Sequence, residues 1–132
     1  MFSSRDTLYI VDPDESVHDA ITTLLDSVEV RVESSRAPED FLADFPEIAS
    51  TGCALLIEAD LSGIGSLELI RRVRARDPRV PIIVLASTND SDIAAQALKA
   101  GAIDVIDKPL IGVHILERIL GVAADARYAT SP

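Results

Sequence analysis

Residues able to do chemistry follow short apolar runs at several places in this 132-residue chain. They include carboxylates, one hydroxyl and one amine: Asp12, Asp14, Glu58, Ser87 and Lys108. Carboxylates near an ammonium group can serve in metal-assisted group transfer, or they can form a structural ion pair. Which of these applies depends on whether the fold brings residues so distant in sequence together.

The apolar runs before these residues have the composition of buried strands. Residues 7–11, 53–57, 81–85 and 103–106 are mostly apolar, with many β-branched side chains. Runs of this length without a helical period are typical of strands covered on both faces of a sheet. Residues 28–33 instead alternate apolar and charged side chains, which predicts a strand near a sheet edge with one solvent-facing side.

Helical spacing of apolar residues separates the predicted strands. Apolar side chains recur at intervals of three and four in residues 15–28, 66–76 and 111–124. A shorter helix is expected to begin near Pro38 and to weaken at Pro46. Another begins near Ser91 and ends before Gly101, because glycine is favoured directly after a helix. These intervals predict helices that lie on a sheet.

The same periodicity predicts the direction of individual side chains. Leu98 falls on the inward side of its helix, and His18 falls on a polar side. The arginines of residues 66–76 are expected to form a solvated face. They are Arg71, Arg72, Arg74 and Arg76. Cys53, the single cysteine, is expected to be an inert core thiol because it lies in an apolar strand.

Five strands alternating with five helices predict an α/β fold in which a parallel sheet is covered on both faces. The most economical arrangement is the flavodoxin-like doubly wound (βα)5 fold with strand order 2-1-3-4-5. In this order the carboxyl ends of the first, third, fourth and fifth strands share one edge. Asp12, Glu58, Ala86, Ser87 and Lys108 would then surround a single crevice.

Composition and length narrow the classes of function. We expect one domain over residues 1–124, followed by a tail or truncated linker at 125–132. The formal net charge of −10 disfavours binding of this domain to nucleic acid or to an anionic membrane. No signal peptide and no apolar run near the ~20 residues of a membrane span are found, so the expected location is the cytoplasm.

Four segments carry a resemblance to a known family. They are IVDPDESV, LLIEADLSG, PIIVLAS and KAGAIDVIDKPL, and the last is the most distinctive. Through them almost the whole chain resembles the receiver domains of two-component response regulators. In that family an acidic pair after the first strand holds Mg²⁺, and an aspartate after the third strand accepts a phosphoryl group from a histidine kinase. A Thr or Ser and a lysine contact the phosphoryl oxygens, and together these groups neutralise the charge of the transferred group.

Two positions of this family pattern are kept. Asp12 stands at the first acidic position, with Asp14 close by, and Lys108 stands at the lysine position, followed by Pro109. An aromatic residue that often lies three residues before the lysine, and that turns inward on activation, is replaced by Val105. The resemblance therefore implies that this rotamer switch does not operate here.

Three positions that carry the chemistry depart from the pattern. The aligned phosphoacceptor is Glu58, and Pro13 replaces the second acidic residue. Ala86 replaces the Thr or Ser, with a hydroxyl one residue later at Ser87. We therefore predict no catalytic residues and at most weak Mg²⁺ binding. Glu58 is instead expected to reach toward Lys108 and form an ion pair that fixes one conformation.

These departures predict an atypical receiver domain that is not an enzyme and works as a phosphorylation-independent interaction module. The resemblance implies a protein partner or a second copy, bound through the face of the fourth helix, fifth strand and fifth helix. A histidine kinase is a further partner that it implies, and a removed DNA-binding output domain would suit a transcription regulator. Two alternatives stay open. A functional phosphoacceptor would use Glu58 or Asp60 with Mg²⁺, and a haloacid-dehalogenase-like phosphatase would use Asp12 and Asp14.

Overall fold

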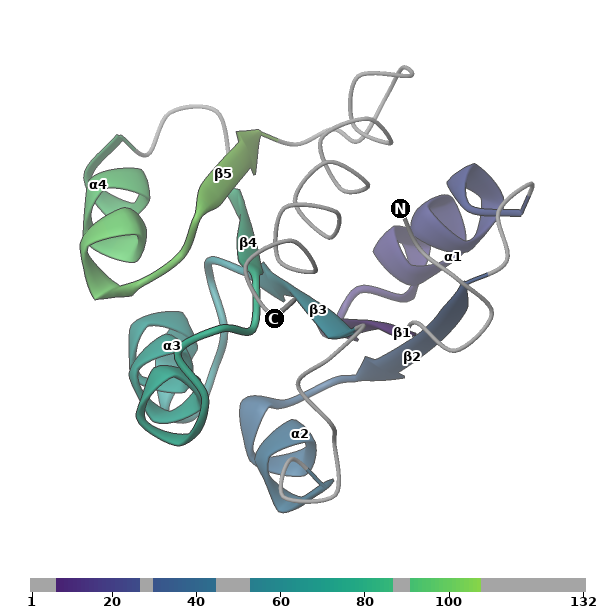
Figure 1. Cartoon of the computed structure of the whole chain (residues 1–132). Coiled ribbons are helices and arrows are strands. Elements are labelled where there is room, and N and C mark those ends of the chain that lie inside the picture. The colour runs from purple at the N-terminus through teal and green to yellow at the C-terminus, as the bar shows by residue number, and fades with distance from the viewer. Residues whose placement is uncertain (1–6, 27–29, 45–52, 87–90, 108–132) are drawn as a thin grey trace.

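The computed structural model describes residues 7–26, 30–44, 53–86 and 91–107, which contain five strands and four helices (Figure 1). The strands are β1 Thr7–Val11, β2 Arg31–Ser35, β3 Cys53–Glu58, β4 Ile82–Ala86 and β5 Asp104–Asp107. The helices are α1 Glu15–Leu24, α2 Pro38–Asp44, α3 Gly65–Arg76 and α4 Ser91–Ala100. Strands and helices alternate along the chain.

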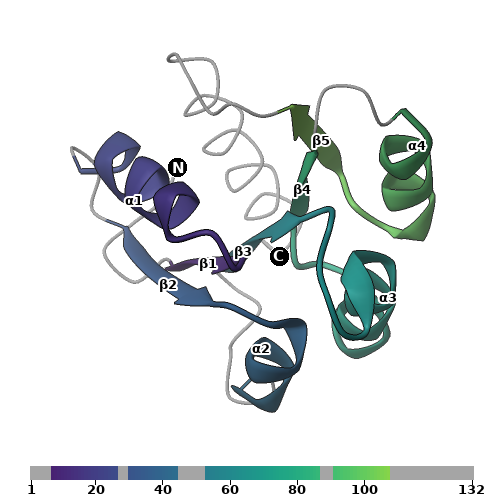
Figure 2. The same ribbon diagram turned by 180° about the vertical axis from the view of Figure 1, so that it is seen from behind.

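The strands form one parallel sheet in the order β2-β1-β3-β4-β5, so the predicted flavodoxin-like α/β fold is confirmed. Helix α1 covers one face of the sheet, and α2, α3 and α4 cover the other, as the two opposite views in Figures 1 and 2 show. The order reverses at β1, which places β1 and β3 side by side at the centre. Ligand sites of open α/β sheets occur at this kind of switch point.

The core follows from the alternation of side chains along the central strands. In β3, Leu55 and Ile57 pack with α2 and α3, whereas Ala54 and Leu56 pack with α1. All four side chains are fully buried. Because both faces are covered, the strand is apolar at consecutive positions and shows no alternation in sequence.

Several element limits differ from the sequence prediction. The edge strand covers Arg31–Ser35, later than the predicted residues 28–33, because Arg31 pairs with Thr7 at the start of β1. Helix α1 ends at Leu24, before the predicted end at 28, and residues 27–29 lie outside the described ranges. Strand β5 begins at Asp104, so Ile103 precedes it.

Three side chains point in directions that the helical and strand periodicity did not predict. Arg74 is half-buried, whereas it was expected to face solvent with the other arginines of α3. Leu98 and Ile103 are 49% and 50% exposed, although both were expected to be covered. The apolar residues of α3 were expected to face the sheet; Leu69, Ile70 and Val73 are fully buried and Leu67 is partly buried.

The predicted helix at 111–124 and the tail at 125–132 lie outside the described residues. Phe45 and Pro46, which were expected near the end of α2, and the side chain of Cys53 also lie outside them. Within the described ranges, none of the helices is long and apolar enough to cross a bilayer.

Candidate functional site

The candidate site begins with two carboxylates at the ends of neighbouring central strands. Val11 of β1 pairs with Ile57 of β3, so Asp12 and Glu58 each follow one member of that pair. Both side chains are buried, with 6% and 8% of their surface exposed. Two buried carboxylates therefore stand at the carboxyl ends of neighbouring parallel strands.

Each of these carboxylates accepts a hydrogen bond from a backbone amide two residues later. The N–H of Asp14 donates to Asp12 Oδ1 at 2.8 Å, and the N–H of Asp60 donates to Glu58 Oε1 at 3.0 Å. An aspartate commonly makes such a turn. The longer glutamate makes the same contact by bending back over its own loop, which fixes the direction of its carboxylate.

The residues after Asp12 serve the start of helix α1. Pro13 is exposed and has no side-chain oxygen, so no carboxylate stands at the second acidic position. Asp14 is the N-cap of α1, and its Oδ1 accepts from the N–H and the hydroxyl of Ser16 at 2.9 and 2.7 Å. Capping of α1 is therefore a sufficient structural role for Asp14. The phosphatase alternative would require Asp14 as a chemical group.

The ends of β4 and β5 lie on the other side of β3 from Asp12. Ala86 is buried at the end of β4 and pairs with Asp107, the last residue of β5. Val105 is half-buried and packs against the core on the α2–α4 side of the sheet. Ser87, Lys108 and Pro109 lie outside the described residues, so the predicted ion pair between Glu58 and Lys108 stays a prediction.

Backbone and side-chain contacts hold the loop that follows Glu58. The N–H of Ala59 donates to the carbonyl of Leu85 at 2.8 Å, and the hydroxyl of Ser66 donates to the carbonyl of Ala59 at 2.7 Å. Ser66 is only 4% exposed. Asp60, the alternative phosphoacceptor, has an exposed side chain on the same loop.

The start of helix α3 receives a cap from a distant element. The N-cap residue Ile64 has no side-chain cap bond of its own, and its N–H donates to Glu39 Oε1 of α2 at 3.1 Å. Gly63 makes this approach possible, because its φ is +76° and a Cβ there would clash with Glu39 Oε1. The loop is therefore tied to α2 as well as to β4.

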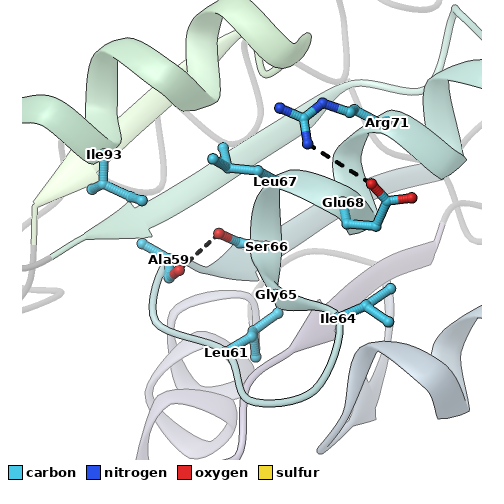
Figure 3. Close-up of a pocket in the computed structure, with 9 residues that line it drawn as sticks. All are labelled: Ala59, Leu61, Ile64, Gly65, Ser66, Leu67, Glu68, Arg71 and Ile93. Carbon is cyan, nitrogen blue, oxygen red and sulfur yellow. Dashed lines mark hydrogen bonds and ion pairs between the residues drawn. The ribbon is translucent and has the colours of Figure 1, made fainter.

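A depression of about 560 Å³ lies beside this loop, between α3 and α4 (Figure 3). Leu61, Ile64, Leu67 and Ile93 line it with apolar side chains, and Arg71 pairs with Glu68 at its rim at 3.8 Å. The residues that line this depression do not include the carboxylates Asp12 and Glu58 at the strand ends.

The resemblance to receiver domains implies Mg²⁺ at the crevice, which the chemistry of the donors can test. In the described ranges, no three His, Cys, Asp or Glu side chains form a group that could hold a metal ion. Pro13 offers no ligand, and one oxygen each of Asp12 and Glu58 already accepts a backbone N–H. Mg²⁺ is held by few protein carboxylates in strict octahedral geometry, so the loss of one is serious. The described residues do not fit a dedicated Mg²⁺ site.

The sequence did not indicate the structural roles of three residues whose side chains hold neighbouring segments together. They are Glu39, Ser66 and Arg74. The partner of Glu39 is 25 residues away, and that of Arg74 is 27 residues away. All three side chains form hydrogen bonds with backbone groups. Because every residue has a backbone, the residue types in the sequence do not indicate these partners. For Ser66, the sequence shows only a serine after Gly65, which is a weak signal.

Comparisons with known proteins agree with this geometry. Residues 8–120 match the family described as "Response regulator receiver domain". The chain is 30% identical over 113 residues to the transcriptional regulatory protein TdiR of Thauera aromatica. The aligned residues cover 86% of this chain and 49% of TdiR. The chain is 33% identical over 120 residues to DctR of Rhodobacter capsulatus, a C4-dicarboxylate transport transcriptional regulatory protein. The aligned residues cover 89% of this chain and 60% of DctR.

A solved structure supports the same relationship. The crystal structure of FixJ-N matches with a TM-score of 0.79 and 28% identity, covering 90% of this chain and 94% of that chain. The two curated relatives are longer, and the chain covers 49% of one and 60% of the other.

Proposed function

The chain belongs to the response regulator receiver family, and we propose that it is an atypical member that works as an interaction module without phosphotransfer. The observation that carries this proposal is the burial and hydrogen bonding of Glu58. It stands at the phosphoacceptor-equivalent position, is 8% exposed, and accepts the N–H of Asp60. Its carboxylate is already engaged in the structure of its own loop.

The length of the side chain argues against phosphotransfer. One additional methylene moves the attacking oxygen by about 1.5 Å, and a misplacement of about 1 Å can cost about 100-fold in rate. Pro13 removes a carboxylate from the metal position, and Ala86 removes a hydroxyl from the fourth strand end. These losses affect the groups that would neutralise charge on a phosphoryl group, so they compound the effect of Glu58.

We propose that the engaged carboxylate holds the domain in one conformation. The contact between Glu58 and the Asp60 amide supports this, and an ion pair with Lys108 would reinforce it. A buried ion pair adds little net stability because desolvation offsets the attraction, so its value would lie in the choice of conformation. The Val105 position lacks an aromatic side chain to switch, which agrees with a domain that has one state.

The proposed interaction surface lies on α4 and on the turn between α4 and β5. Among the described residues, the large apolar side chains of Leu98 and Ile103 are exposed, at 49% and 50%. We propose that a second copy of the chain, or another protein, covers them, with a histidine kinase as a further partner. Since TdiR and DctR are transcriptional regulators and are longer than this chain, we also propose a cytoplasmic regulator in which residues 125–132 lead to an output domain.

The test of phosphotransfer is incubation of the chain with acetyl phosphate and Mg²⁺, followed by intact-mass and peptide mass spectrometry. We expect no phosphoryl adduct, and no spectral change with beryllofluoride, while a receiver domain that has an aspartate at the phosphoacceptor position serves as the positive control. The variants Glu58→Gln and Asp60→Asn assign any adduct. An adduct on the parent chain that is absent from one of these variants would identify the substituted residue as the phosphoacceptor and refute the proposal.

The test of the interaction surface is sedimentation of Leu98→Glu and Ile103→Glu variants over a range of concentrations. We expect each to weaken self-association, because a charge replaces an apolar contact. Thr22→Glu, at an exposed position of α1 on the other face of the sheet, adds the same charge as a control. Equal sedimentation of all variants and the parent would exclude this surface for self-association.

A further inference from the structure

The depression between α3 and α4 combines an apolar lining with a charged rim (Figure 3). Four apolar side chains line it, and each is only half-buried, although each also packs against the core on that side of the sheet. They are Leu61, Ile64, Leu67 and Ile93. Apolar surface that is hollowed and bordered by polar groups is typical of a binding site.

Arginines gather on the helix that borders this depression. Residues 65–80 contain five arginines and two acidic residues, whereas the formal net charge of the whole chain is −10. Arg72 and Arg76 follow Glu68 at intervals of four, and positions with this spacing share one face of a helix. A positive surface therefore adjoins the depression on a negatively charged protein. The exposed arginines are Arg71, Arg72, Arg76 and Arg79.

The remaining arginine, Arg74, does not belong to this surface. It is half-buried, and its Nε and Nη2 donate to the carbonyl of Gly101 at 3.0 and 2.8 Å. A Cβ at Gly101 would lie 2.8 Å from Cγ of Arg74. Arg74 therefore has a structural role, because it joins α3 to the turn after α4.

Two exposed arginines next to the depression share one carboxylate. Arg72 Nε donates to Glu68 Oε2 at 3.0 Å, and Arg71 Nη1 lies 3.8 Å from Glu68 Oε1. The side chains of Arg71 and Arg72 are 60% and 50% exposed. One carboxylate cannot accept from all the N–H groups of two guanidinium groups. This arginine rim, Arg71 and Arg72, therefore has donors for further carboxylates, which guanidinium groups bind in paired geometry.

We propose that the depression and its arginine rim bind an acidic amphipathic segment of another protein. Apolar side chains of the segment occupy the depression, and its carboxylates pair with Arg71 and Arg72. The net negative charge of the rest of the chain repels such a segment, so the arginine rim determines where it binds and in which orientation. Charge complementarity and the apolar lining thus select the same partner.

Nucleic acid fits this surface less well. A phosphate backbone has no apolar groups to place against Leu61, Ile64, Leu67 and Ile93. The carboxylate of Glu68, which pairs with both rim arginines, repels phosphate, and so does the net charge of −10. A protein segment with both leucine-like and acidic side chains matches the depression as well as the rim.

This inference goes beyond the proposed function and can fail separately from it. It depends on the lining and rim of the depression, which include neither Glu58 nor Leu98 and Ile103. A phosphoryl adduct on the chain would refute the proposed function and leave peptide binding unaffected. Absence of peptide binding would leave the interpretation of Glu58 unchanged.

The experiment measures binding of a fluorescein-labelled peptide to the whole chain by fluorescence anisotropy. The peptide has leucines at intervals of three and four among glutamates, so a helix formed by it has one apolar and one acidic face. Two control peptides replace its leucines by serine or its glutamates by lysine. We expect saturable binding of the first peptide only. Its affinity should fall as salt rises from about 0.1 to about 1 M, because the Debye length shortens from about 10 to about 3 Å.

Substitutions around the depression locate the binding site. Arg71→Gln and Arg72→Gln should each weaken binding about 2- to 5-fold, as expected for an exposed ion pair, and the double variant about 5- to 20-fold. Ile93→Ser should weaken it about 5-fold, because an apolar contact is lost. Arg31→Gln, at an exposed position of the outermost strand β2, removes the same charge and should leave the affinity unchanged.

The serine control peptide tests the apolar lining even if Ile93→Ser does not fold, since it leaves the protein unaltered. Failure of the leucine-containing peptide to bind would overturn the inference. Equal binding of the serine control would overturn it too, because charge alone would then explain the affinity. So would an unchanged affinity in the Arg71→Gln, Arg72→Gln double variant. Tighter binding of a short DNA duplex than of the peptide would assign the arginines to nucleic acid instead.

Discussion

Replacing Ser66 by alanine should destabilise the domain through one buried hydrogen bond beside the candidate site. The hydroxyl of Ser66 is buried and donates to the carbonyl of Ala59 at 2.7 Å. Removing it leaves a buried carbonyl with one partner fewer, which costs about 1–3 kcal/mol. The higher helix propensity of alanine returns at most about 0.5 kcal/mol. The expected net loss in the free energy of unfolding is therefore about 1–2 kcal/mol.

Urea unfolding followed by circular dichroism measures this loss. With a urea dependence of about 2 kcal/mol per M, the midpoint should fall by about 0.5–1 M with an unchanged slope. Ser62→Ala, in the exposed part of the same loop, makes the same chemical change and should leave the midpoint where it is. Equal midpoints for the two variants would refute the reasoning, since the bond to Ala59 would then contribute nothing.

Three further predictions concern other parts of the fold. Leu56→Ala, at a fully buried position of β3, should lower the free energy of unfolding in urea by about 2–5 kcal/mol, because it leaves a cavity. Leu98→Ala is the control at an exposed position. A smaller loss for Leu56→Ala than for Leu98→Ala would contradict the burial of Leu56. Asp14→Ala should cost about 0.5–2 kcal/mol through loss of the α1 cap, with Asp14→Asn largely preserving the midpoint. Gly101→Ala should cost at least about 1–2 kcal/mol for its positive φ, and the cost should shrink in an Arg74→Ala background, which a double-mutant cycle measures.

The architecture could be predicted because its signals are repeated along the chain. Apolar runs such as residues 53–57 alternate with helical periods, and parallel strands joined by helices allow few topologies. Once the strand order is known, Asp12 and Glu58 must lie at neighbouring strand ends. The hydrogen bond from the Asp60 amide to Glu58 could not be predicted, because it depends on the rotamer of one side chain.

The inward position of Arg74 and the exposure of Leu98 could not be predicted for related reasons. Periodicity reports residue types on a helix face, whereas the partners of Arg74 are carbonyl groups of Gly101 and Val80, which every residue possesses. Leu98 lies on the apolar side of α4, but α4 packs near β5 at the margin of the sheet, where less surface is available to cover it.

The two outermost strands have a consequence for the behaviour of the protein at high concentration. β2 and β5 each leave one row of backbone amides and carbonyls without a neighbouring strand of this sheet, and such rows can template fibrils. Arg31 and Glu33 on β2, and Asp104 and Asp107 on β5, place ionisable groups along these margins. Stacking of molecules edge to edge would bring these charges out of water, so we expect the charged side chains of β2 and β5 to disfavour amyloid-like growth.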